Sequence, residues 1–193
     1  FERFATRYQK VATSIDRIVD ALERTRMALL KDITVLDKMF ELNLSQGAKP
    51  GKGGILPGAK VTEQIAKIRL IEPGQDSISP NRHPEIQNND DLLDMIHHIR
   101  TLTGKPVGFK LCIGDRREFE EVCRQMVATG IKPDFITVDG AEGGTGAAPE
   151  VAKKNIAMPL EYAIPKVHRF LEEEGIRDEM VVMASGGVRT AYD

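Results

Sequence analysis

Short apolar segments, each followed by a glycine-rich or polar loop and then by an amphipathic helix, recur through residues 41–193. The apolar segments lie at about 40–44, 76–80, 107–113, 135–138 and 180–184. Helical patterns occupy 62–70, which Thr62 caps, a stretch that Asn89 caps, 115–129, which Gly130 closes, and 159–174. Apolar strands that alternate with helices are typical of parallel β/α units buried on both faces. Because ligands in such folds bind at the carboxyl ends of strands, the loops that follow the strands are the candidate sites.

Residues 1–40 have a different pattern, with neither glycine nor proline. Their apolar residues are spaced three or four apart, with charged residues between them. The step from Leu29 to Ile33 departs from a strict heptad, which favours a long amphipathic helix or a bent helical hairpin over a regular coiled coil. We expect this segment to form a unit separate from residues 41–193. Its apolar stripe comprises Phe4, Tyr8, Val11, Ile15, Ile18, Leu22, Leu29, Ile33, Leu36 and Phe40.

The charge balance of 27 basic and 29 acidic residues argues against a nucleic-acid or polybasic membrane surface. No apolar run approaches the roughly 20 residues of a membrane helix, and no signal-peptide pattern opens the chain. Cys112 and Cys123 form neither a disulfide framework nor a metal cluster. We therefore expect a soluble, cytoplasmic protein without a metal site.

Three strand-end features could carry a ligand. In Ser185–Arg189, two glycines follow a strand, which suits either a phosphate site or a tight turn that needs glycine only for its backbone angles. The segment Asp139–Gly146 has four glycines in eight residues, which suits close approach by a ligand or a flexible loop. Lys110 interrupts an apolar strand, so its ammonium should meet an anionic or electron-rich partner unless the strand end is exposed.

Further polar residues lie in and beyond the loop that follows the segment at 40–44. Gln46, Lys49 and Lys52 lie in a loop rich in glycine and proline, and Arg69 lies on the short helix beyond it. Cations at such a loop suit a phosphate or a dicarboxylate, although solvated lysines are the ordinary alternative. His83 could act as an acid or base, or could serve as a capping or surface residue.

Five of these segments occur together in one order and spacing, and as a set they closely resemble the FMN-binding barrel of glutamate synthase over about residues 41–193. The sequences of the segments GFKLCIG and VDGAEGGTGAAP are most similar to those of the short, stand-alone members of that family. The resemblance implies a (β/α)8 barrel with FMN at its carboxyl face. The five segments are Ser45–Gly54, Ile78–Pro80, Lys110–Leu111, Asp139–Ala147 and Gly186–Thr190.

The resemblance also implies a reaction. In that family ammonia adds to 2-oxoglutarate, and reduced FMN delivers hydride to the resulting 2-iminoglutarate to give L-glutamate. Roles for individual residues are carried over by motif. Gln46 and Lys49 would be catalytic residues that face flavin and substrate, Arg69 and Lys49 would bind the substrate carboxylates, and Lys110 would stabilise negative charge on the reduced flavin. The flavin pocket would contain Asp139, Gly143, Gly144 and Thr145, and the flavin phosphate would be bound by Ser185, Gly186 and Gly187.

The chain also departs from that pattern. It offers five strand candidates, whereas a closed barrel has eight, so the expected fold is a partial (β/α)8 barrel of about five units. It has neither an iron–sulfur cysteine cluster nor the N-terminal cysteine of an amidotransferase domain. Residues 1–40 resemble a helical stretch of toxic-anion (tellurite) resistance proteins in Phe4–Lys10 and Leu29–Ile33. The expectation is a fragment or a fusion.

Unpaired strand edges of a partial barrel favour self-association or a partner chain that completes it. Such a site should hold FMN poorly in the isolated chain, because its loops depend on a closed sheet. Two alternatives to the flavin enzyme remain. One is a non-catalytic protein in which the helical segment directs assembly and the barrel is a remnant. The other is a phosphate-binding barrel without redox chemistry that uses Ser185–Gly187.

Overall fold

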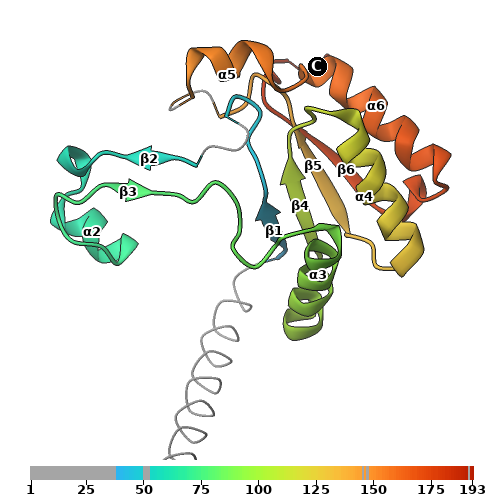
Figure 1. Ribbon diagram of the computed structural model, residues 1–193, viewed down its shortest axis with the longest axis horizontal. Helices are drawn as coiled ribbons and strands as arrows, with labels where there is room; N and C mark the ends of the chain where they lie inside the picture. The colour runs from blue at the N-terminus through green and yellow to red at the C-terminus, as the bar shows by residue number, and fades with distance from the viewer. Residues whose placement is uncertain (1–37, 50–52, 145, 147, 191) are drawn as a thin grey trace, which may run out of the picture.

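The computed structural model describes residues 38–49, 53–144, 146, 148–190 and 192–193. Its centre is a parallel sheet in the order β1-β4-β5-β6 (Figure 1). The strands are β1 (Phe40–Asn43), β4 (Val107–Leu111), β5 (Phe135–Asp139) and β6 (Val181–Ser185). An α/β fold with a parallel sheet is therefore confirmed. Residues 1–37 of the helical segment predicted at 1–40 lie outside the described part of the chain, and Phe40, at the predicted end of that segment, is the first residue of β1.

Helix boundaries follow local capping. The hydroxyl of Thr62 accepts the Ile65 N–H at the start of α2 (Glu63–Arg69), as the sequence predicts. Likewise, α4 (Arg116–Thr129) begins at the Asp115 cap and ends at Gly130. The remaining elements are α3 (Asn89–Thr103), α5 (Glu150–Asn155), α6 (Leu160–Glu173), and the short 3-10 helices η1 (Gly58–Lys60) and η3 (Arg177–Glu179).

One predicted cap was wrong by a residue. Asn88, not Asn89, caps α3, because the Asn88 side chain accepts the Asp91 N–H at 2.9 Å from an extended backbone while Asn89 is already helical. The short helix α5, between β5 and α6, was not predicted from the sequence.

The hydrophobic core lies on one face of the sheet, where alternate strand residues pack against α3, α4 and α6. The rings of Phe119 on α4 and Phe170 on α6 lie 6.2 Å apart across this layer. The fully buried members of the core include Leu93, Ile96, Val107, Phe109, Ile136, Val138, Val167 and Leu171.

The other strand residues face the opposite side of the sheet, and several of them are polar. Asn43, Lys110 and Thr137 are neighbours in register on β1, β4 and β5. Thr137 donates its hydroxyl to the Glu41 carboxylate at 2.6 Å and so connects β5 with β1 across β4. This face therefore carries hydrogen-bonding groups in a row that leads toward the carboxyl ends of the strands.

The segment at 76–80 is not a strand of the parallel sheet, which corrects the count of five strands. Only Ser77–Ile78 form a strand (β3), and it pairs antiparallel with β2 (Ile55–Leu56) in a separate two-stranded sheet. With α2, this hairpin projects away from the parallel sheet (Figure 1). A strand of two residues is too short to show an apolar pattern, so the sequence could not indicate which strand β3 pairs with.

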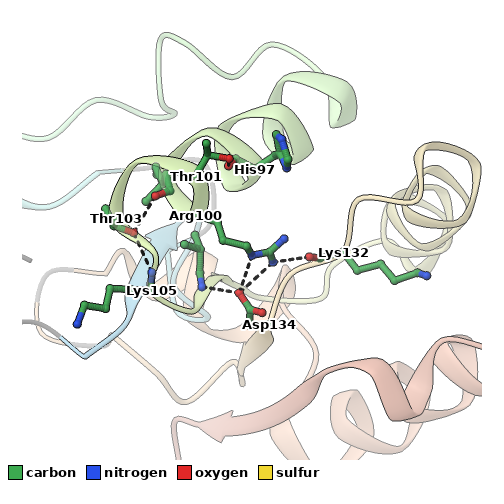
Figure 2. A network of polar contacts seen from close by, with 9 residues as sticks. His97, Arg100, Thr101, Thr103, Lys105, Lys132 and Asp134 are labelled. Atoms are coloured by element: carbon green, nitrogen blue, oxygen red, sulfur yellow. Dashed lines mark hydrogen bonds and ion pairs between the residues drawn. The ribbon is translucent and has the colours of Figure 1, made fainter. Parts of the chain in front are cut away.

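A polar network fixes the amino-terminal end of the sheet (Figure 2). Asp134 Oδ2 accepts the backbone N–H of Val107 at 2.7 Å and the Arg100 Nε–H at 3.0 Å. The same guanidinium donates to the Lys132 carbonyl. The network thus ties α3 to the starts of β4 and β5. Among the described residues, no helix has both the length and the apolar character to cross a membrane.

Candidate functional site

Asp139, the last residue of β5, lies where the loops at the carboxyl end of the sheet meet. Its side chain is almost completely buried, and Oδ2 accepts the backbone N–H of Gly47 at 2.8 Å. Gly47 belongs to the loop after β1, so this bond joins segments separated by 92 residues. A buried carboxylate is costly unless it is paired and hydrogen-bonded, so Asp139 needs a cationic partner besides this hydrogen bond.

Lys110, near the end of β4, supplies the pairing charge. Its Nζ lies 3.5 Å from Asp139 Oδ1 and donates to Ser185 Oγ at 3.3 Å. The Lys110 side chain is 18% exposed, so its ammonium borders the site instead of extending into solvent. Four neighbouring parallel strands therefore contribute to one polar cluster: the loop after β1, Lys110, Asp139 and Ser185.

Two predicted glycines pack into this cluster. A Cβ at Gly143 would lie 2.3 Å from Asp139 Oδ1, which no real side chain tolerates. Gly144 has a φ of +69°, and a Cβ there would lie 2.7 Å from Gln46 Oε1. The Gly143 carbonyl also accepts the Ala48 N–H at 2.7 Å. The glycines after β5 thus let that loop lie directly on the loop after β1.

Gly186 and Gly187, after β6, also have left-handed backbones, with φ of +81° and +76°. Beyond them, the backbone N–H groups of Arg189 and Thr190 both donate to Asp193 Oδ2, at 2.8 and 2.7 Å. The amides of this segment therefore converge on an anionic oxygen. A cavity of about 330 Å³ lies beside it, lined by both glycines, Arg189 and Glu142.

Gln46 and Lys49 line a second cavity of about 290 Å³. Gln46 Oε1 is buried and accepts no hydrogen bond from any described residue. The cavity lies between the loop after β1 and the segment that follows β3, from which Ser79, Arg82 and His83 contribute. His83 Nε2 lies 3.2 Å from the Asn43 carbonyl and so holds that segment against the end of β1.

The remaining predicted residues are not brought into this group. Arg69 lies exposed in the last turn of α2, on the projecting hairpin, and does not line the cavity that contains Lys49. Lys52 and Thr145 lie outside the described residues. In the part of the chain that the structure describes, no group of three His, Cys, Asp or Glu side chains could hold a metal ion.

Sequence reasoning missed the contact between Ser45 and Cys112, because no local pattern indicates it. Ser45 Oγ accepts the Cys112 N–H at 3.0 Å and donates to its Sγ at 3.4 Å, linking the ends of β1 and β4. Burial raises the pKa of the Cys112 thiol, which the hydrogen bond from Ser45 partly opposes. Cys112 is therefore a neutral thiol at neutral pH. Arg82, which lines the cavity, was also missed, because a loop arginine has no sequence periodicity.

The comparisons with known proteins agree on one family. Residues 10–193 match the family described as a conserved region in glutamate synthase. The chain is 44% identical to the glutamate synthase large subunit-like protein YerD of Bacillus subtilis over 79% of its own length and 29% of that protein. It is 38% identical to the archaeal-type glutamate synthase [NADPH] of Thermotoga neapolitana, over 92% of this chain and 35% of the relative.

A third relative, the archaeal glutamate synthase [NADPH] of Methanocaldococcus jannaschii, is 36% identical over 92% of this chain and 34% of its own length. The chain thus spans about a third of the length of the curated relatives it matches. The family match starts at residue 10, inside the segment expected to form a separate unit. The resemblance of residues 1–40 to toxic-anion resistance proteins gains no support from these matches.

Proposed function

The chain belongs to the glutamate synthase family, and from that premise we propose that it contributes an FMN site to an oxidoreductase that makes L-glutamate from 2-oxoglutarate and ammonia. The observation that carries this proposal is the cluster at the carboxyl ends of β1, β4, β5 and β6, where Lys110 lies 3.5 Å from Asp139 beneath glycine loops. In parallel β/α folds this is the end at which ligands bind.

The described residues fit an FMN. The buried Gln46 Oε1 lacks a donor, which an N–H of a flavin ring could supply. Gly143 and Gly144 leave no room for a Cβ, and Gly186 and Gly187 have backbones that glycine alone adopts readily. The phosphate is assigned to Ser185, Gly186 and Gly187 through their motif, because the N–H groups of Arg189 and Thr190 beyond them are already bonded to Asp193. Thr145, carried over to this pocket, is part of the proposal through its motif alone.

Bound FMN, in its reduced form, would supply the hydride for reduction of 2-iminoglutarate and would itself become oxidised. The chain's own residues would bind and orient the reactants. Lys49 pairs with a substrate carboxylate, and Gln46 holds flavin and substrate through its amide. The Lys110 ammonium stabilises negative charge that develops beside it in a partly buried site. Arg69 is proposed as a carboxylate partner on the resemblance alone, since α2 lies away from the parallel sheet (Figure 1).

We propose further that the four parallel strands are part of a (β/α)8 barrel. Among the described strands, β1 and β6 are the edges of the parallel sheet, and such edges favour pairing with further strands. A cytoplasmic location belongs to the same proposal, and it is supported by two free cysteines, as expected in a reducing compartment.

The test is a titration of the purified chain with FMN, followed by flavin absorbance and fluorescence. We expect a dissociation constant weaker than about 1 μM, because the site depends on neighbouring strands. Lys110→Met should weaken the binding of reduced FMN more than that of oxidised FMN, since the lysine stabilises the negative charge of the reduced flavin. Lys132→Met is the matched control, because Lys132 pairs with Glu179 at the other end of the sheet.

Reoxidation of the bound, reduced flavin by 2-oxoglutarate plus ammonia would establish the reaction. Absence of any flavin binding up to millimolar FMN contradicts the proposal. Binding of phosphate esters without flavin would instead favour the phosphate-binding alternative that rests on Ser185–Gly187.

A further inference from the structure

The Asp139 carboxylate contacts groups from four elements, although only one of its oxygens accepts a backbone hydrogen bond. Oδ2 accepts the Gly47 N–H at 2.8 Å, and Oδ1 lies 3.5 Å from Lys110 Nζ. Gly143 covers both oxygens, and a Cβ at Gly186 would lie 3.3 Å from Oδ1. Loops after β1, β5 and β6 and the Lys110 side chain therefore surround a single buried charge.

We propose that Asp139 is a positioning residue: it holds the Lys110 ammonium and the loop that carries Gln46 in place and offsets the charge of Lys110, without itself touching the ligand. This inference rests on the proposed FMN site and refines the role of Asp139 within it. The residue acts through Lys110 and Gly47.

Packing explains why Asp139 does not contact the ligand. A Cβ on Gly143 would lie 2.3 Å from Oδ1 and 2.4 Å from Oδ2, so the Gly143 backbone already occupies the space above the carboxylate. The side chain of Asp139 is 2% exposed, whereas that of Lys110 is 18% exposed. The lysine is therefore the member of the pair that a ligand can reach, and the aspartate lies behind it.

The proposal gives the carboxylate two roles: in the loop role it holds the Gly47 amide, and in the charge role it offsets the charge of Lys110. Two substitutions separate these roles. Asp139→Asn keeps an oxygen that can accept the Gly47 N–H but removes the negative charge. Asp139→Ala removes both. The charge role predicts that the two variants change the ratio of dissociation constants for oxidised and reduced FMN alike. The loop role predicts that only Asp139→Ala releases the Gly47 amide.

The loop role is tested without FMN, by amide hydrogen exchange of the unloaded, full chain followed by NMR. The Gly47 amide should be protected in the parent chain and in Asp139→Asn. It should exchange at least about tenfold faster in Asp139→Ala, which lacks its acceptor. Unchanged exchange at Gly47 in Asp139→Ala overturns the loop role, whatever the chain does with FMN.

The charge role is tested by the ratio of dissociation constants for oxidised and reduced FMN. Without the negative charge of the carboxylate, the Lys110 charge is no longer offset. Relative to the parent chain, Asp139→Asn should therefore shift the ratio of the two dissociation constants in favour of reduced FMN by on the order of tenfold. An unchanged ratio in Asp139→Asn overturns the charge role. If the parent chain binds no FMN, the proposed function and the charge role both fail, while the exchange experiment still decides the loop role.

Asp134→Asn is the matched control, because Asp134 has the same chemistry at the opposite end of β5. Its carboxylate also accepts a buried backbone N–H, from Val107, and pairs with a basic side chain, that of Arg100. This substitution should lower thermal stability without altering Gly47 exchange or the FMN ratio. Equal effects of Asp134→Asn on both readouts would mean that Asp139 acts only through general stability, which also overturns the proposal.

Discussion

Asp139 accepts the backbone N–H of Gly47 at 2.8 Å and thereby joins the end of β5 to the loop after β1, two strands away in the sheet. The strand between them, β4, contributes Lys110 to the same carboxylate. The candidate site thus depends on three strands in their correct order. Its geometry should be sensitive to substitutions that disturb loop packing and insensitive to those at exposed positions.

Gly143→Ala should destabilise the chain by about 1–3 kcal/mol, because the new methyl group would overlap the buried Asp139 carboxylate. Urea denaturation measures the change. Gly146→Ala is the matched control in the same loop, since a Cβ there meets nothing within 4 Å, and it should change stability by less than about 0.5 kcal/mol. Equal effects of the two substitutions would contradict the packing seen at Gly143.

The chain should lose stability at alkaline pH through Cys123. Burial in α4 raises the pKa of this thiol to about 12. In the unfolded chain the thiol ionises at its lower, ordinary pKa, so the unfolded state releases a proton that the folded state keeps. The contribution of Cys123 to the free energy of unfolding is therefore fully present below the pKa of the thiol in the unfolded chain. It is lost as pH rises toward 12, by up to about 1.4 kcal/mol per pH unit.

Unfolding free energies of the parent chain and Cys123→Ala between pH 8 and pH 11 test this sign. Alanine cannot ionise, so the variant should show the shallower pH dependence, even though its stability at neutral pH is lower because of the cavity it leaves. Parallel pH profiles would show that the thiol does not carry the effect.

Asp134→Ala should destabilise the chain by about 1–3 kcal/mol, because it leaves the buried Val107 N–H without its acceptor and releases Arg100 (Figure 2). Chemical denaturation gives the value. Arg117→Ala removes a fully exposed partner of Asp115 and should leave the unfolding midpoint unchanged. A large effect of Arg117→Ala, or none of Asp134→Ala, would contradict this assignment.

Arg82 and Arg69 offer a direct comparison for carboxylate binding. Arg82 lines the cavity with Lys49, whereas Arg69 lies on the projecting hairpin. Arg82→Ala and Lys49→Ala should each weaken 2-oxoglutarate binding by on the order of tenfold, measured by calorimetry with FMN present. Arg69→Ala should have the smaller effect. If Arg69→Ala has the larger effect, the role carried over from the family holds, and the hairpin occupies another position when substrate binds.

Much of the fold could be predicted from short stretches of sequence. Thr62, Asp115 and Gly130 mark helix ends because each acts on backbone groups within a few residues of itself. The sequence indicated that Lys110 has an anionic partner because a charge inside an apolar strand needs one, and Asp139 lies 3.5 Å from it. The pairing of β3 was not predictable, since a two-residue strand lacks a periodic pattern that could distinguish a parallel from an antiparallel partner.

The sequence by itself determined where the four strands of the parallel sheet, the helices α2, α3, α4 and α6 and the glycine loops lie, and the loop motifs alone were enough to indicate the family. These features depend on periodicity, capping and backbone freedom, all of which act locally. Only the tertiary structure decided that Asp139 meets Gly47, that Ser45 bridges to Cys112, and that Arg69 lies apart from Lys49. Such contacts depend on strand order and register, which bring together residues far apart in the chain.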